Sequence, residues 1–142
     1  MTISYSLTDS SVFSIPNPHD CTIEKIFFDH DRLCLVFESN IAYHDSIKAQ
    51  HPVAKSLIIR YHLLDQDVRL YRYRRLRALK PREGYMLEKS EMLTQLTEKK
   101  WKPDYIGHYL SGCSMIIELC SDKSYRLELE VDTIEYEWIE SQ

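Results

Sequence analysis

The stretch YRLELEVDTIEYEWIE, residues 125–140, carries the clearest structural signal in the sequence. Apolar and charged side chains alternate along it, first around Leu127 and Leu129 and then around Tyr136 and Trp138. Alternation with a period of two is typical of a strand that buries one face and leaves the other in water. The stretch therefore predicts two half-buried antiparallel strands, 125–132 and 133–140, with Trp138 in the core.

The same alternation recurs upstream in three further stretches: TIEKIFFDHDRLCLVFES (22–39), SLIIRYHLL (56–64) and SMIIELC (114–120). Polar residues interrupt these runs at 29–31 and follow them at 65–67, a spacing that is typical of β-hairpins. Because no helices alternate with the strands, the sequence predicts an antiparallel sandwich or open barrel of about seven or eight strands.

One segment departs from the period of two. GYMLEKSEMLTQLTEKKW (84–101) places Met92, Leu93 and Leu96 at helical spacing, and Pro103 prevents a helix from continuing. We predict one helix of about three turns near Leu87–Lys100. With this helix the predicted fold class is mainly β (α+β).

The chain has 142 residues, which suits a single domain spanning 1–142 with residues 1–18 as a peripheral N-terminal segment. Its start, MTISYSLTDS, lacks the basic and apolar regions of a secretory signal. No apolar run approaches the length of a membrane span. We expect a cytoplasmic protein that does not enter a membrane and whose four cysteines are reduced thiols.

Charge is distributed unevenly along the chain, although the net charge is only −4. Arg60–Arg82 contains eight basic and two acidic residues, whereas Glu118–Glu140 contains eight acidic and two basic residues. An acidic protein is a poor general binder of nucleic acid, because phosphate affinity depends on Lys and Arg. The asymmetry instead favours pairing of a basic strand with acidic strands. Each cross-strand ion pair would stabilise the folded protein by about 0.2–1 kcal/mol.

The basic stretch LYRYRRLRALKPR (70–82) is the main candidate for binding a ligand or a partner. The candidate residues are its tyrosines and central arginines: Tyr71, Tyr73, Arg72, Arg74, Arg75 and Arg77. In a strand, Arg72 and Arg74 share the face of Leu70. Three alternatives remain open for these two arginines. They pair with an internal carboxylate, they turn outward at a β-bulge, or they line a concave sheet face that binds an anionic small molecule or nucleotide. On the opposite face, Arg75 and Arg77 meet the acidic strands or solvent.

Two His-Asp dipeptides, His19-Asp20 and His44-Asp45, provide an alternative site of a different class. Together they could form the metal centre of a metal-dependent phosphoryl hydrolase. Metal-dependent His-Asp phosphohydrolases, however, place the dipeptide in a helical bundle, and this chain has mostly strands. The sequence also lacks a G-x-S-x-G motif and a Gly-rich phosphate loop. We therefore expect a protein that is not an enzyme and has no cofactor.

The segment PHDCTIEKIFFDHDRLCLVFE (18–38) resembles the start of small bacterial domains of uncharacterised or toxin-immunity type. In such domains a step of His, Asp and a small residue precedes the first hairpin, and the last strand carries a late Trp, as TIEYEWIE does. The resemblance implies a bacterial β-rich protein that acts by binding another protein, in an immunity or phage–host conflict setting. The resemblance does not fix the oligomeric state, and a homodimer is one of the possible states.

Overall fold

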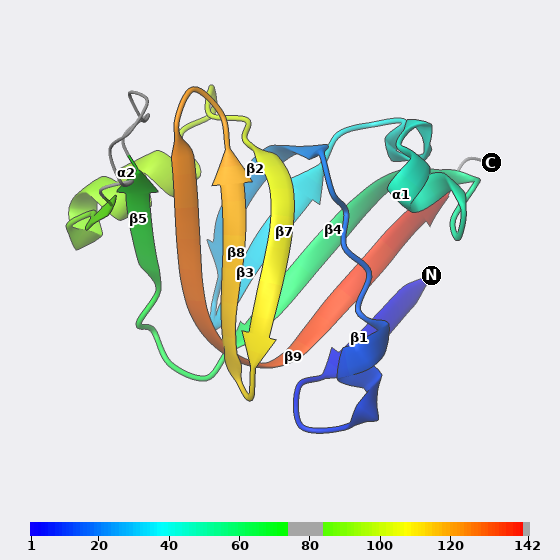
Figure 1. Ribbon diagram of the computed structural model, residues 1–142, viewed down its shortest axis with the longest axis horizontal. Helices are drawn as coiled ribbons and strands as arrows, with labels where there is room; N and C mark the ends of the chain where they lie inside the picture. The colour runs from blue at the N-terminus through cyan, green and yellow to red at the C-terminus, as the bar shows by residue number, and fades with distance from the viewer. Residues whose placement is uncertain (74–83, 141–142) are drawn as a thin grey trace, which may run out of the picture.

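The computed structural model of the protein describes residues 1–73 and 84–140 (Figure 1). The strands are β1 (Thr2–Ser6), β2 (Cys21–Asp29), β3 (Arg32–Phe37), β4 (Ala54–Leu63), β5 (Arg69–Tyr73), β6 (Gly84–Met86), β7 (Asp104–Ser111), β8 (Ser114–Cys120) and β9 (Ser124–Glu140). The helices are α1 (Asp45–Lys48) and α2 (Lys89–Thr97), with short 3-10 turns η1 (Ser10–Ser14) and η2 (Ile41–Tyr43).

All nine of these strands belong to one antiparallel sheet. Eight of them follow the order β4-β3-β2-β7-β8-β9-β5-β6, and β1 pairs with β9 outside this order. The sheet curls back on itself because the long strand β9 pairs with β8 and β5 through its first half, and with β4 and β1 through its second half. Figure 1 shows β9 running beside β8, turning, and continuing beside β4. β2 and β7 share only a short pairing at Cys21 and Thr22, so the barrel is open there. The predicted mainly β fold with an antiparallel sheet is confirmed, with nine strands among the described residues.

β9 is one continuous strand, so the prediction of two separate strands was wrong. The buried positions change phase in its middle: Leu129 and Val131 are buried, and the next buried residue is Ile134. The pairing with β4 shifts at the same place, where Thr133 faces His62 and Val131 faces Leu63. One extra residue in a strand is a β-bulge, which bends the strand and reverses the side-chain alternation. The bulge thus lets both halves of β9 face the core.

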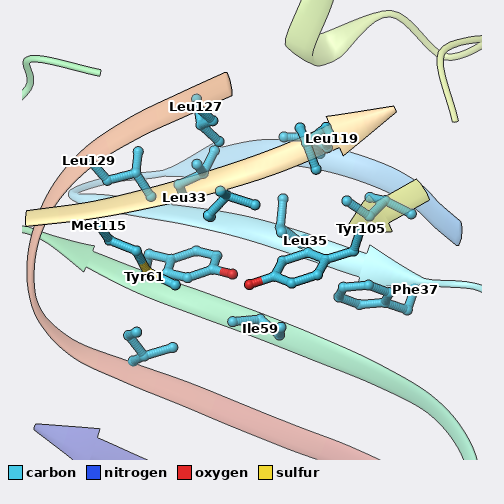
Figure 2. Packing of buried hydrophobic residues seen from close by; sticks show 14 of the residues in the cluster. Leu33, Leu35, Phe37, Ile59, Tyr61, Tyr105, Met115, Leu119, Leu127 and Leu129 are labelled. Atoms are coloured by element: carbon cyan, nitrogen blue, oxygen red, sulfur yellow. The ribbon is translucent and has the colours of Figure 1, made fainter. Parts of the chain in front are cut away.

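The barrel interior is filled by large apolar and aromatic side chains (Figure 2). Trp138 has only 1% of its surface exposed, which confirms the predicted burial. Tyr61 and Tyr105 approach from opposite sides of the barrel with their hydroxyl groups pointing toward one another, and the Tyr105 hydroxyl is 2.6 Å from Nδ1 of His108. The N-terminal segment adds Tyr5 to this core through β1.

α2 contacts β2 and β5 at one end of the barrel. It occupies the predicted segment but is shorter than Leu87–Lys100. Met92 and Leu96 are buried as expected, whereas Leu93 is 38% exposed and faces away from the core. A helix of this length presents only a narrow apolar stripe, so three neighbouring apolar positions cannot all be covered. Among the described residues, no helix has the length and apolar character needed to cross a membrane.

The four cysteines are free, and none forms a disulfide. Cys34 alternates with Leu33 and Leu35 and therefore lies on the outward face of β3. It is nevertheless 1% exposed, with Phe27 and Arg60 directly opposite it on the neighbouring strands. Burial raises the pKa of the Cys34 thiol.

Two half-buried histidines, His51 and His108, predict that stability falls in mild acid. Burial lowers the pKa of His108, and that of His51, below the ordinary value of 6.5. The unfolded chain therefore binds protons more readily than the folded protein. The stability that these imidazoles contribute is present above pH 6.5 and is lost as the pH falls through their folded pKa values. Urea melts at a series of pH values should show this decline.

Single substitutions assign the decline to its source. We expect His108→Asn to flatten the dependence of the unfolding free energy on pH, and His51→Asn to remove much of what remains. His30→Asn is the matched control, because the His30 side chain is 92% exposed. An unchanged pH dependence in His108→Asn would contradict the assignment.

Candidate functional site

β5 divides the predicted binding residues between the two faces of the sheet. Leu70 and Arg72 point toward the core, whereas Tyr71 and Tyr73 point outward. The division of these residues follows the alternation predicted from the sequence. Arg74, Arg75 and Arg77 lie outside the described residues.

Arg72 is held by neutral groups rather than by a carboxylate. Its guanidinium group lies over the ring of Tyr125 at 5.6 Å and over the ring of Tyr85 at 5.9 Å. Nη1 donates to the Tyr85 hydroxyl at 3.2 Å, and Nη2 donates to Oε1 of Gln95 at 3.1 Å. Cation–π contacts and neutral acceptors therefore replace the internal carboxylate that was one of the predicted alternatives.

The groove beside Arg72 does not suit an anion. It has a volume of about 340 Å³ and is lined on the α2 side by Ser90, Glu91, Thr94, Gln95 and Glu98. Two carboxylates in the lining oppose a carboxylate or phosphate ligand, because like charges repel. One N–H of Nη1 and one N–H of Nη2 already have acceptors. These contacts argue against the predicted anionic-ligand site at Arg72.

The outward face of strands β6, β5, β9, β8 and β7 collects aromatic and apolar side chains from strands that are distant in sequence. Directly paired residues share a face of a sheet. One row runs from Met86 through Tyr71 and Arg126 to Glu118, and a second runs from Arg69 through Glu128 and Ile116 to Tyr109. Tyr73 lies in a third row, opposite Ser124. We call six residues of these rows the tyrosine face: Tyr71, Tyr73, Met86, Tyr109, Ile116 and Arg126.

The tyrosine face is accessible to a partner. Tyr109 is 61% exposed and Met86 is 54% exposed, while Tyr71, Tyr73 and Ile116 are half-buried. In the alternate positions of the same strands, Leu70, Leu127 and Ile117 are fully buried and fix the orientation of the sheet.

Basic side chains of β4 and β5 pair with carboxylates of β9, as the charge asymmetry predicted. Arg69 Nη2 is 3.4 Å from Glu128 Oε2, and Arg60 Nη2 is 2.9 Å from Glu137 Oε1. Nε2 of His62 is 2.9 Å from Oε1 of Glu135. The acidic strand β9 thus pairs with basic residues on β4 and β5.

The two His-Asp dipeptides line one cavity of about 620 Å³ between the loop before β2 and the η2–α1 segment. His19 Nε2 is 3.2 Å from Asp20 Oδ2, and His19 Nδ1 is 2.5 Å from the carbonyl oxygen of Ile106. His44 Nε2 is 2.5 Å from Oε1 of Glu38. The structure therefore brings together His19, Asp20, His44 and Asp45, as the alternative site requires.

The side chains around the cavity differ from the usual arrangement of a metal site. In the described part of the chain, no three His, Cys, Asp or Glu side chains converge on a point that a metal ion could occupy. Structural zinc sites need four ligands and catalytic sites usually need three. Burial, together with the carboxylates of Glu38, Asp20 and Asp104, raises the pKa of the neighbouring Cys21 thiol to about 12, which favours the thiol over the nucleophilic thiolate at neutral pH.

Sequence reasoning missed several residues of these two sites. Met86, Tyr109 and Arg126 belong to the tyrosine face, and Glu38 orients His44. The alternation of β9 shows that Arg126 points outward, but no local signal places it opposite Tyr71.

No family model, no curated protein and no solved structure matches the chain.

Proposed function

We propose that the protein is a non-catalytic binding module whose partner is another protein that docks on the tyrosine face. The observation that carries this proposal is the gathering of three tyrosines, Met86, Ile116 and Arg126 on one outward sheet face. Tyr, Met and Arg are enriched in the centres of protein interfaces. The ion pair between Arg69 and Glu128 lies in the same row as Ile116 and Tyr109.

The contrast with the opposite side of the barrel supports this choice of surface. There, charged residues that point outward from β4 and β9 are paired, Arg60 with Glu137 and His62 with Glu135. A partner that covered those pairs would desolvate charges that already have partners, with little gain. The tyrosine face offers aromatic area that is favourable to bury.

The resemblance of residues 18–38 to bacterial immunity-type domains suggests the setting of the proposed function. It favours a bacterial, cytoplasmic protein whose partner belongs to immunity or phage–host conflict. The resembling segment forms the β2–β3 hairpin, which lies in the barrel wall and contributes no residue to the tyrosine face.

Affinity capture from a lysate of the source organism tests the proposal. We compare the parent protein with Tyr71→Ala/Tyr109→Ala and with Tyr43→Ala, a matched control because Tyr43 is 88% exposed elsewhere on the surface. A protein retained by the parent and the control should be depleted by more than about tenfold on the double variant, since central aromatic residues carry much of an interface's energy. Equal retention on all three proteins would contradict the proposed surface.

Metal analysis tests the rival hydrolase. If the His-Asp cavity has no metal-dependent function, dialysed protein should hold far less than one equivalent of zinc or manganese. A stoichiometric metal that survives dialysis and disappears in His19→Ala/Asp20→Ala would support the rival function. His30→Ala, which alters an exposed histidine outside the cavity, is the matched control.

A further inference from the structure

Arg126 differs from every other arginine in the described part of the chain. Arg32, Arg60 and Arg69 pair with carboxylates, and Arg72 donates to Tyr85 and Gln95. Arg126 has neither an ion pair nor a hydrogen-bond acceptor among the described residues. Its Nε is buried without a partner, as are the Nε atoms of Arg69 and Arg72. Its guanidinium group instead lies over the ring of Tyr73 at 5.4 Å.

Arg126 also lines a cavity. The cavity has a volume of about 420 Å³, and its polar lining includes Tyr73, Glu118, Ser124 and Arg126. Stacking on Tyr73 holds the guanidinium in a defined orientation, which lowers the entropic cost of using its donors. The cavity therefore presents oriented donors that no described residue uses.

We propose that Arg126 receives the carboxylate of an aspartate or glutamate side chain from the protein partner. This inference rests on the proposed function, because a partner that covers the tyrosine face takes Arg126 out of water. A desolvated guanidinium without an acceptor is costly, so a stable complex has to supply an anion at this position. The planar fork of donors matches a carboxylate in a bidentate geometry.

Glu118 narrows the chemistry to a carboxylate rather than a phosphate. It is the direct cross-strand neighbour of Arg126 on β8 and lines the same cavity, yet the two side chains do not form an ion pair within the described structure. Glu118 repels any anion beside Arg126, but it repels a phosphate with nearly two negative charges more strongly than a carboxylate with one. Glu118 also offers an acceptor to a backbone N–H of the bound segment.

The Nε–H signal of Arg126 in ¹H–¹⁵N NMR spectra provides a direct test. The signal is assigned by its loss in Arg126→Lys. Titration with N-acetylglutamate amide should move it in a saturable way, and the neutral N-acetylglutamine amide should not. Tyr73→Ala should weaken the response while Tyr73→Phe preserves it, because the ring provides the stacking. Equal responses to the two probes, or none to either, would overturn the proposal.

A separate titration tests whether the site prefers a carboxylate to a phosphate. Inorganic phosphate should leave the Arg126 signal of the parent protein in place and move that of Glu118→Gln. A phosphate response in the parent as large as the response to N-acetylglutamate amide would refute a site for carboxylates and indicate a general anion site.

The captured partner separates failure of this inference from failure of the proposed function. Arg126→Lys should weaken partner binding by more than about tenfold, because lysine lacks the bidentate fork. If Tyr71→Ala/Tyr109→Ala abolishes binding and Arg126→Lys does not weaken it, the docking surface stands and the carboxylate inference fails. If no partner is retained but Arg126 responds selectively to the glutamate probe, the site stands and the proposed protein partner fails.

Discussion

Trp138→Ala is expected to lower the free energy of unfolding by about 3–5 kcal/mol, the usual cost of removing a large aromatic side chain from a core. Trp138 is 1% exposed, and its indole ring stacks on the imidazole of His51 with ring centroids 3.7 Å apart. It also lies near Tyr136, with ring centroids 6.1 Å apart. The cavity left by alanine would remove support from both rings.

Denaturant melts of Trp138→Ala and Ile139→Ala provide the measurement and its control. Ile139 follows Trp138 on β9 but is 37% exposed on the opposite face, so its truncation should cost under about 1 kcal/mol. If the two variants lose similar stability, the assignment of faces in the second half of β9 is wrong. A Trp138→Ala variant that melts like the parent would have the same meaning.

Val131→Pro is expected to prevent folding. Val131 is fully buried next to the bulge, and its backbone N–H donates to the carbonyl oxygen of Cys113 at 2.8 Å. Proline removes that donor and cannot occupy the middle of a paired strand without disrupting it. Because β9 pairs with four other strands, the damage would reach both halves of the barrel.

Circular dichroism and urea melts compare Val131→Pro with two controls. Val131→Ala keeps the N–H group and should remain folded, with a loss of about 1–3 kcal/mol from the removed methyl groups and the cavity. Asp132→Ala changes an exposed side chain at the bulge and should have a small effect. A cooperative transition in Val131→Pro at the parent's midpoint would show that β9 is not the shared strand.

The local alternation of the sequence was sufficient to predict which side chains face the core. Leu33, Leu57 and Leu127 are buried as their strands predict, because the alternation of a strand is fixed by its own backbone geometry. The helix near α2 was also predicted from its own spacing, although its length was overestimated. The phase change between Val131 and Ile134 is equally visible in the sequence, but a bulge and a break between strands leave the same local pattern.

The sequence by itself therefore determined the mainly β fold, the inward and outward faces of most strands, and the opposite charges of the segments around β5 and β9. Only the tertiary structure decided which strands are neighbours. The double pairing of β9, the position of Arg126 beside Tyr71, and the meeting of the two His-Asp dipeptides in one cavity all depend on contacts between residues far apart in the chain. Local periodicity carries no information about such contacts, because they are selected by the packing of the whole barrel.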